Sequence, residues 1–352
     1  MNLCISGGRR LAAAAVTLAC VGGALTACSS SRPQATSSPK ATHKAAVVMP
    51  LTGESADAVP AHPAVSVKIP ADMAARPQRG LTSADNVWVE LVEGGEVRYD
   101  AVFFSNLAEK IGPIRSVRPV DVPINAPLHG VLLASGGQPD FLTKVGEGVG
   151  KLLVEDTAGD ATWRTRERRM PYNLYGSAKL AAERAGDLKA PPAQWQFGKA
   201  TGGQAVTEFT ATYPSWKSGW TWSGSAWQRS DNGKPTSDIE GPRVEAADVV
   251  VLKVATKETQ YLDPIGNPVV DTVFEGSGEA RLARDGKVWE ATWHKAAAKD
   301  PVTLTGADGK KLALAKGKVW IELVPDSATW FASTPAPQES GSATPTTSSN
   351  KK

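Results

Sequence analysis

The strongest constraint on the fold is a series of strand–turn–strand patterns between residues 205 and 332. In 279–295, EARLARDGKVWEATWHK, two runs of alternating apolar residues meet at Asp285-Gly286, a pair typical of two-residue hairpin turns. Asp308-Gly309 divides the run 302–324 in the same way. Because strands joined by such tight turns are antiparallel, this C-terminal half of the chain is predicted to be a mostly antiparallel β domain.

The C-terminal half also holds most of the chain's 11 tryptophans: Trp216, Trp220, Trp222, Trp227, Trp289, Trp293, Trp320 and Trp330. Because they lie within the hairpin patterns, we expect most of them to pack in a core. Any that remain outside would offer aromatic surfaces to sugar rings or to a protein partner. The tetrapeptide Gly-Lys-Val-Trp occurs at 286–289 and 317–320, which we interpret as two similar strand starts rather than an internal duplication.

The N-terminal half, 49–190, mixes strand and helix patterns. Residues 86–104, NVWVELVEGGEVRYDAVFF, read as a hairpin around two glycines, and 130–137 read as a buried strand followed by a turn. Residues 177–186 combine a Ser cap, helix-forming residues and a terminal Gly, which predicts a short helix. We therefore expect an α+β protein, with a mixed α/β half, a linker at 191–204 and an antiparallel β half.

The N-terminus resembles the leader of a bacterial lipoprotein. Arg9 and Arg10 precede an apolar run, 11–25, that is short for a membrane span and is followed by Thr-Ala-Cys. The ending Leu-Thr-Ala-Cys is similar to a lipobox, which implies that residues 1–27 are a cleaved signal peptide and that Cys28 is lipidated. The chain is then expected to be lipid-anchored on the extracytoplasmic face of the cell membrane.

Composition predicts disordered segments at both ends, a flexible tether at 28–48 and a tail at 333–352. Cleavage before Cys28 removes two of the chain's 3 cysteines, so neither a disulfide nor cysteine catalysis is expected. Loss of Arg9 and Arg10 also lowers the 39 Lys and Arg residues to 37, against 36 Asp and Glu. Because the mature chain is nearly neutral, nucleic acid is not expected as a partner.

Two arginines stand three residues apart in 112–119, GPIRSVRP. Guanidinium groups suit bidentate contact with phosphate or carboxylate, and a turn at Ser116-Val117 would bring Arg115 and Arg118 to one side. The other candidate ligand-binding residues are Arg164, Arg168, Asn173, Gly136 and Gly137. If these segments converge, they form an anion site to which the two glycines contribute backbone N–H groups. Otherwise the arginines pair internally with Asp85, Glu90, Glu93 or Asp121 and stabilise the fold.

Several segments resemble the YerB-like lipoproteins, a two-part bacterial family of unknown function. The resemblance is carried by residues 75–105, 112–119, 134–141 and 168–175 in the N-terminal half, and by 247–254, 274–293 and 317–325 in the C-terminal half. It implies an envelope-facing lipoprotein and does not imply an enzyme. The family commonly has His where this chain has Tyr172, so no general base is expected there.

The favoured function is therefore a binding or scaffolding module of the cell envelope, without cofactor, metal ion or catalytic residue. Its expected partners are the membrane, through lipidated Cys28, and either cell-wall synthesis proteins or an anionic glycopolymer. As an alternative, the order of the motifs resembles the LytR-CpsA-Psr phosphotransferases, which act on polyprenyl-pyrophosphate glycopolymers. That resemblance would make Asp85 a Mg²⁺ ligand and Arg115 and Arg118 pyrophosphate ligands, although Pro119 stands where that family has an acidic residue. The two hypotheses differ in whether Asp85 and the two arginines converge.

Overall fold

The N-terminal half is built around the hairpin predicted at 86–104. β4 (Asn86–Leu91) and β5 (Val97–Phe103) are antiparallel, and β3 (Val65–Pro70) adds antiparallel to the other side of β5. Gly94 and Gly95 in the connection have φ of 70° and 76°, a conformation that glycine adopts without steric cost. The hairpin and its glycine turn are confirmed.

Parallel strands and short helices complete this half. β6 (Val131–Ala134) lies parallel to β3, and β7 (Lys151–Val154) parallel to β6. The α-helices are α1 (Asp121–Asn125), α2 (Pro139–Gly148), α3 (Glu155–Ala158) and α4 (Ala178–Glu183). The 3₁₀ turns are η1 (Met73–Ala75), η2 (Leu81–Ser83), η3 (Glu93–Gly95), η4 (Ala126–Leu128) and η5 (Gly159–Ala161). Two small pairs are β1 (Val47–Val48) with β2 (Ser55–Ala56), and β8 (Thr162–Arg164) with β9 (Leu174–Gly176).

The structure is a computed structural model that describes residues 47–239, 241–263 and 265–333. The signal peptide, Cys28, most of the tether and nearly all of the tail lie outside these residues, so the expectations for them stay predictions. Within the described residues, no helix is long and apolar enough to cross a membrane.

Antiparallel strands dominate the C-terminal half, as predicted. Its strands are β10 (Gln204–Ala205), β11 (Glu208–Thr212), β12 (Lys217–Trp222), β13 (Trp227–Asp231), β14 (Lys234–Pro235), β15 (Glu245–Ala246), β16 (Asp248–Leu262), β17 (Pro268–Val273), β18 (Gly276–Arg284), β19 (Lys287–Lys295), β20 (Thr303–Gly306), β21 (Val319–Pro325) and β22 (Trp330–Ser333). β18 and β19 form a hairpin around Asp285 and Gly286, whose φ of 50° and 68° are both positive, as a type I′ turn requires. The α+β class is confirmed.

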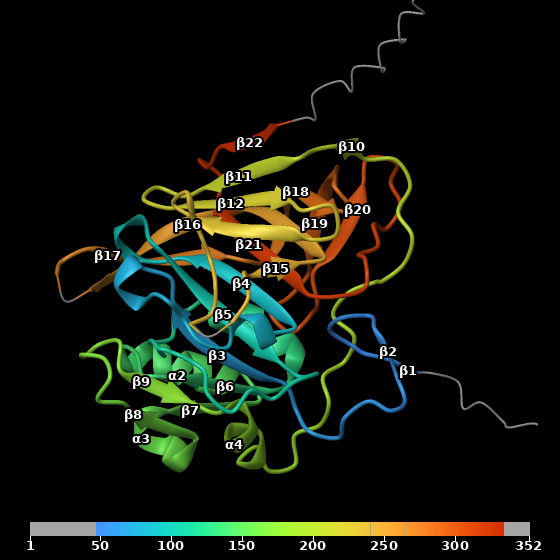
Figure 1. Cartoon of the computed structure of the whole chain (residues 1–352). Helices are drawn as coiled ribbons and strands as arrows, with labels where there is room; N and C mark the ends of the chain where they lie inside the picture. Colours follow the sequence, from blue (N-terminus) through green and yellow to red (C-terminus); the bar gives the residue numbers. More distant parts are fainter. Residues whose placement is uncertain (1–46, 240, 264, 334–352) are drawn as a thin grey trace, which may run out of the picture. The chain divides into compact units, whose positions relative to one another are not determined.

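One strand of the C-terminal half joins the two halves into a single sheet. β21 lies between β16 and β4 and runs parallel to both, so that Ile321 pairs with Val250 on one side and Trp88 on the other (Figure 1). The resulting twelve-stranded sheet has the order β10-β19-β18-β16-β21-β4-β5-β3-β6-β7, with β17 on β16 and β20 on β19. A six-stranded sheet, β14-β13-β12-β11-β22 with β15 on β13, packs against it. The two halves thus share one sheet, a parallel junction that local hairpin patterns do not predict.

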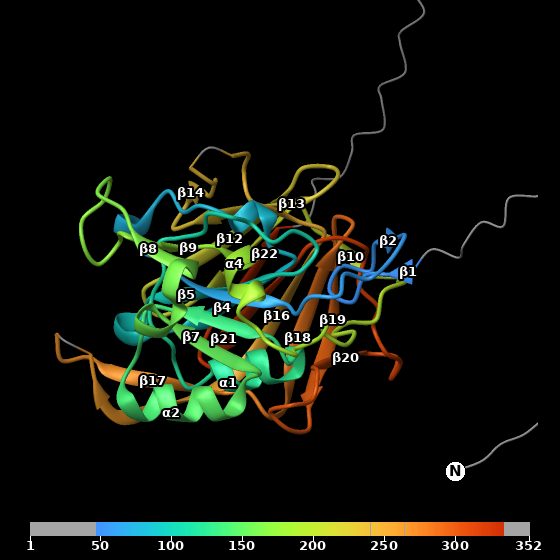
Figure 2. The same ribbon diagram turned by 90° about the horizontal axis from the view of Figure 1, so that it is seen from below.

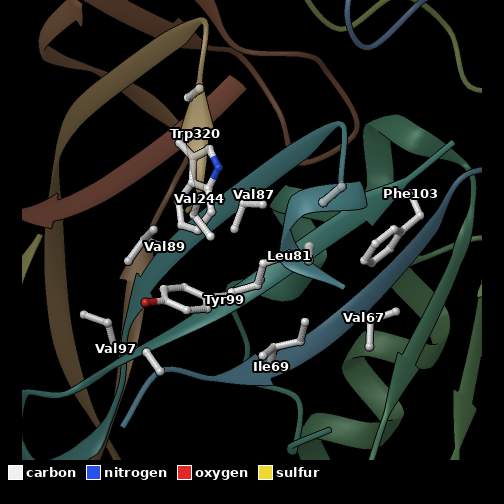
Figure 3. Close-up of a cluster of buried hydrophobic side chains, with 14 of the residues drawn as sticks. Val67, Ile69, Leu81, Val87, Val89, Val97, Tyr99, Phe103, Val244 and Trp320 are labelled. Carbon is white, nitrogen blue, oxygen red and sulfur yellow. The ribbon is translucent and has the colours of Figure 1, made fainter. Parts of the chain in front are cut away.

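The main core is also shared between the halves. In Figure 3, Val87, Val89 and Tyr99 of the N-terminal half meet Val244 and Trp320 of the C-terminal half. The rings of Tyr99 and Trp320 lie 5.4 Å apart at 75°, an edge-to-face arrangement that aromatic pairs favour. The fully or nearly fully buried tryptophans of the C-terminal half are Trp216, Trp220, Trp227, Trp293 and Trp320, so the expectation that most of them pack in a core is confirmed.

Side chains of β3, β4 and β5 alternate between the two faces of the sheet, as strand geometry requires. Val67 and Ile69 face the apolar core beside α4, whereas Lys68 faces the opposite side, where α1 and α2 lie (Figure 2). Both faces are covered. This second face carries the charged residues described next.

Candidate functional site

The segment 112–119 lies beside the ends of β3 and β6. Arg115 N–H donates to the Lys68 carbonyl at 2.9 Å, and Ser135 N–H donates to the Arg115 carbonyl at 3.0 Å. Ile114 and Val117 are fully buried, which leaves Arg115 and Arg118 partly exposed. The segment therefore presents both arginines, and its two apolar side chains hold it against the fold.

Arg118 is paired within the protein. Its Nε and Nη2 donate to the two carboxylate oxygens of Glu93 at 2.5 and 2.6 Å, and its Nη1 donates to the Val117 carbonyl at 2.7 Å. Burial acts to raise the pKa of Glu93, but the hydrogen bonds and charge of Arg118 outweigh it, and this pKa is lowered. Glu93 was one of the acidic partners expected if the arginines stabilise the fold, and for Arg118 that alternative describes the structure.

A third arginine lies beside these two. Arg98, on β5, is buried, and its Nη1 donates to the Ser116 carbonyl at 2.8 Å. Burial and the charges of Arg118 and Arg115 lower the pKa of Arg98 to about 9. Because like charges repel, this concentration of guanidinium groups favours the approach of an anion. We call Arg98, Arg115 and Arg118 the arginine cluster.

Arg115 is the member of the cluster without a partner. Its Nε is buried and donates no hydrogen bond, and its side chain forms no ion pair within the described part of the chain. A buried donor left unpaired costs roughly 1–3 kcal/mol, and more when the group is charged. Arg115 is therefore the position where an added anion would gain most.

Gly136 and Gly137 pack against the arginine segment. The Gly136 carbonyl accepts from Val117 N–H, and a Cβ at Gly137 would lie 2.7 Å from Val117 Cγ2. Among the described residues, the two glycine N–H groups donate to no acceptor. Gln138 follows them at the N-cap position of α2, and its side chain does not cap the helix. Free amides and a helix N-terminus favour negative charge, as expected for the two glycines.

The other candidate residues are engaged elsewhere. Arg164 binds both oxygens of Glu155 at 2.6 Å and the Asn173 amide oxygen at 2.6 Å. Arg168 donates to the carbonyls of residues 74, 75 and 76 at 2.8–3.0 Å and so holds η1 in place. These contacts account for Arg164, Arg168 and Asn173 without a ligand.

Tyr172, where no general base was expected, lies close enough to Arg115 to interact with its charge. Burial and a hydrogen bond with Asp72 raise the pKa of Tyr172, and the charges of Arg115 and Arg168 only partly oppose this. The phenol therefore stays neutral at physiological pH. It adds a hydroxyl group, not a base, to the surroundings of Arg115.

Asp85 does not join the arginines. Its carboxylate accepts from Phe104 N–H at 2.6 Å and Ser105 N–H at 2.7 Å, and burial raises its pKa. Asp85 precedes β4 whereas Glu93, which binds Arg118, follows it, and the six residues of β4 span about 20 Å. The convergence required by the phosphotransferase alternative is not found.

A buried charged group lies behind the arginine cluster. Lys68 Nζ is 2.6 Å from Asp121 Oδ1, 2.7 Å from Glu90 Oε1 and 3.9 Å from Asp100 Oδ2, and all four side chains are fully buried. Asp121 also accepts from Arg118 N–H at 2.7 Å, and Asn125 donates to Asp100 at 2.6 Å. We call Lys68, Glu90, Asp100 and Asp121 the lysine cluster. It links β3, β4 and β5 to α1 and supports one end of the arginine segment.

Sequence reasoning missed Arg98, Lys68 and Asp100. The available signal was a single charge at alternate positions of strands that are otherwise apolar, as in VSVKIP and VRYDAVF. Such a charge in a strand buried on both faces must find an opposite charge in the tertiary structure. Among the described residues, no group of three or more His, Cys, Asp or Glu side chains is arranged to hold a metal ion.

Comparison with known proteins gives the same family for both halves. Residues 51–190 match the N-terminal domain, and residues 205–321 the C-terminal domain, of the family described as "Protein of unknown function (DUF3048)". The chain is 27% identical over 271 residues to "Putative lipoprotein YerB" of Bacillus subtilis (strain 168), covering 72% of this chain and 78% of that protein. The crystal structure of YerB from Bacillus subtilis matches with a TM-score of 0.70 at 26% identity, covering 81% of this chain and 99% of that one. The resemblance drawn from the motifs is confirmed.

Proposed function

Because the chain belongs to the DUF3048 family, described as of unknown function, we propose from its own geometry that it is an anion-binding module of the cell envelope. Its ligand is an anionic glycopolymer, and Arg115 is the central contact. The single observation that carries this proposal is the partly exposed guanidinium group of Arg115, which forms no hydrogen bond or ion pair with the described residues although the neighbouring Arg118 is fully paired.

The groups around Arg115 suit a phosphate. Arg98 and Arg118 add positive charge, the N–H groups of Gly136 and Gly137 are unpaired, and the Tyr172 hydroxyl lies nearby. A guanidinium group can bind two phosphate oxygens at once, and backbone amides can bind a third. Acidic side chains of a wall-synthesis protein present single carboxylates and would use fewer of these donors.

The envelope location is part of the proposal. It is supported by the lipobox-like ending at Cys28 and by the similarity to a protein named as a lipoprotein. A lipid anchor would hold the folded part near the membrane, with the tether setting its reach. Tethering raises the effective concentration of envelope polymers, so a modest intrinsic affinity is sufficient.

The test is a calorimetric titration of the purified chain with inorganic phosphate and with poly(glycerol phosphate), each carried out at two salt concentrations. Arg115→Gln removes the charge and the unpaired donor, and we expect at least a tenfold loss of affinity for both probes. Arg166→Gln is the matched control, because Arg166 is exposed in the same half and lies outside the arginine cluster.

Equal affinities for the wild type, the Arg115 variant and the control would refute the proposal. Binding that is lost equally in both variants would indicate a general charge effect and would refute it as well. A melting curve for each variant verifies that Arg115→Gln leaves the fold intact, since Arg115 forms no side-chain hydrogen bond or ion pair with the described residues.

A further inference from the structure

A hollow of ligand size lies in the C-terminal half, away from the arginine cluster. Its volume is about 660 Å³, within the range of small-molecule sites, and its walls come from residues 199–204, β19 and the turn 306–313. In the sheet order, six strand spacings separate β19 from β3, which bears Lys68 behind the arginine cluster. At about 4.8 Å per spacing the two places are roughly 30 Å apart, so the hollow is independent of the arginine cluster.

Trp289 forms one wall, and the backbone fixes its ring. Its Nε1–H donates to the Thr201 carbonyl at 2.9 Å. Gly203 lies against the ring with φ of 79°, and a Cβ there would be 2.5 Å from Trp289 Cε2. Glycine therefore serves both the backbone conformation and the close approach. The indole is held in a single orientation while part of it stays accessible.

The tryptophans of the two Gly-Lys-Val-Trp tetrapeptides differ in burial, and only Trp289 remains partly accessible. Trp320 of the second copy is fully buried and packs on Tyr99 and Trp220. Trp289 of the first copy is only partly buried and lines the hollow. The surrounding structure orients this aromatic ring outside the main core, where it can contact a ligand.

Unpartnered positive charge faces the same space. Lys199 and Lys311 line the hollow, are exposed, and form no ion pair or side-chain hydrogen bond within the described residues. The acidic groups of the hollow are already paired with cations: Glu290 Oε1 accepts from Arg281 at 2.8 Å, and Asp308 Oδ2 lies 3.4 Å from Lys310 Nζ. The charge available to a ligand is therefore positive.

From these features we infer that the hollow binds an acidic saccharide. The C–H face of a sugar ring stacks on the negative face of the indole, while Thr201 and Gln204, which also line the hollow, offer polar groups. Lys199 and Lys311, whose ammonium groups are point charges on flexible side chains, bind a carboxylate or phosphate on the sugar. The inference stands on its own residues and does not depend on Arg115.

The experiment is a ligand-observed NMR titration of the full chain with glucose, glucuronic acid and glucose 6-phosphate. We expect both acidic sugars to bind at least tenfold more tightly than glucose, and their order distinguishes carboxylate from phosphate. Trp289→Leu should weaken all three at least fivefold. Lys199→Gln combined with Lys311→Gln should remove the preference for acidic sugars and leave glucose unchanged.

Matched controls separate the hollow from other effects. Lys189→Gln with Lys299→Gln makes the same charge change at exposed lysines elsewhere, and Trp222→Leu removes a partly buried tryptophan outside the hollow. Both should leave sugar affinity unchanged, as should Arg115→Gln. Absence of binding, equal affinity for neutral and acidic sugars, or binding that is lost in Arg115→Gln but kept in Trp289→Leu would each overturn the inference.

Discussion

Replacing Lys68 by Met should destabilise the protein strongly at neutral pH. Lys68 is the one ammonium group among three buried carboxylates, two of them within 2.7 Å of its Nζ. Removing one partner of a buried ion pair costs about 3–5 kcal/mol, because a buried carboxylate that has lost its cation must stay charged without solvation or take a proton that it would not hold in water at pH 7. Of a typical unfolding free energy of about 5–15 kcal/mol, this is a large fraction. Urea unfolding at pH 7, followed by circular dichroism, measures it.

The same substitution predicts a pH dependence with a definite sign. Burial is the main cause that raises the pKa of Glu90 from 4.5 to about 8 and the pKa of Asp100 from 3.8 to about 7. The nearby charge of Asp121 adds to the increase in both groups. The folded state therefore binds more protons than the unfolded state between about pH 4 and pH 8, and the contribution of these groups to stability falls as pH rises through that window. Lys68→Met obliges one further carboxylate to take a proton in the folded state. The deficit of the variant, meaning the unfolding free energy that Lys68→Met loses relative to the wild type, should therefore decrease by about 1.4 kcal/mol for each pH unit between pH 7 and pH 5.

Lys179→Met is the control, because the Lys179–Glu109 pair is 55% and 76% exposed. Exposed pairs of this kind contribute about 0–1 kcal/mol, so this variant should unfold nearly as the wild type does at both pH values. The reasoning is refuted if Lys68→Met costs less than about 1 kcal/mol at pH 7, or if its deficit is the same at pH 5 and pH 7.

Two further predictions concern the contact between the two halves and the attachment of the chain to the membrane. Arg229→Met should lower the unfolding free energy by about 3–5 kcal/mol, because it removes one partner of buried ion pairs. Arg229 is fully buried, pairs with Glu322 at 2.6 Å and Asp231 at 2.8 Å, and lies 5.2 Å from the Tyr99 ring of the other half. Chemical denaturation measures the loss, and a value below about 1 kcal/mol would contradict the prediction. Cys28→Ser should abolish incorporation of a radiolabelled fatty acid and release the chain from the membrane fraction, whereas unchanged labelling would exclude Cys28 as the lipidated residue.

Local features of the chain were predicted well. The hairpin at 86–104, the Asp285-Gly286 turn and the Ser177 cap of α4 depend on neighbouring residues, whose backbone preferences and hydrogen bonds act over a few positions. Family membership was also evident, because motifs of the family occur in order through both matched domains, residues 51–190 and 205–321. These are properties that a sequence carries segment by segment.

The candidate site was predicted only in outline. Nothing in the sequence shows which of Arg115 and Arg118 has an acidic partner. Only the tertiary structure shows that Glu93 pairs with Arg118 and that Arg115 has no partner among the described residues. The signal for Lys68 was present as a charge in an apolar strand, but its partners Glu90 and Asp121 are brought to it by other elements.

The sequence by itself determined the turns, the strand periodicity and the residue types able to bind an anion. Only the tertiary structure decided that β21 lies between β16 and β4, that one sheet passes through both halves, and that Trp289 lines a hollow while Trp320 is buried. The physical reason is the range of the interactions. A hairpin is encoded by adjacent residues, whereas strand order and charge pairing depend on burying surfaces that are distant in the chain, and many pairings satisfy the same local pattern.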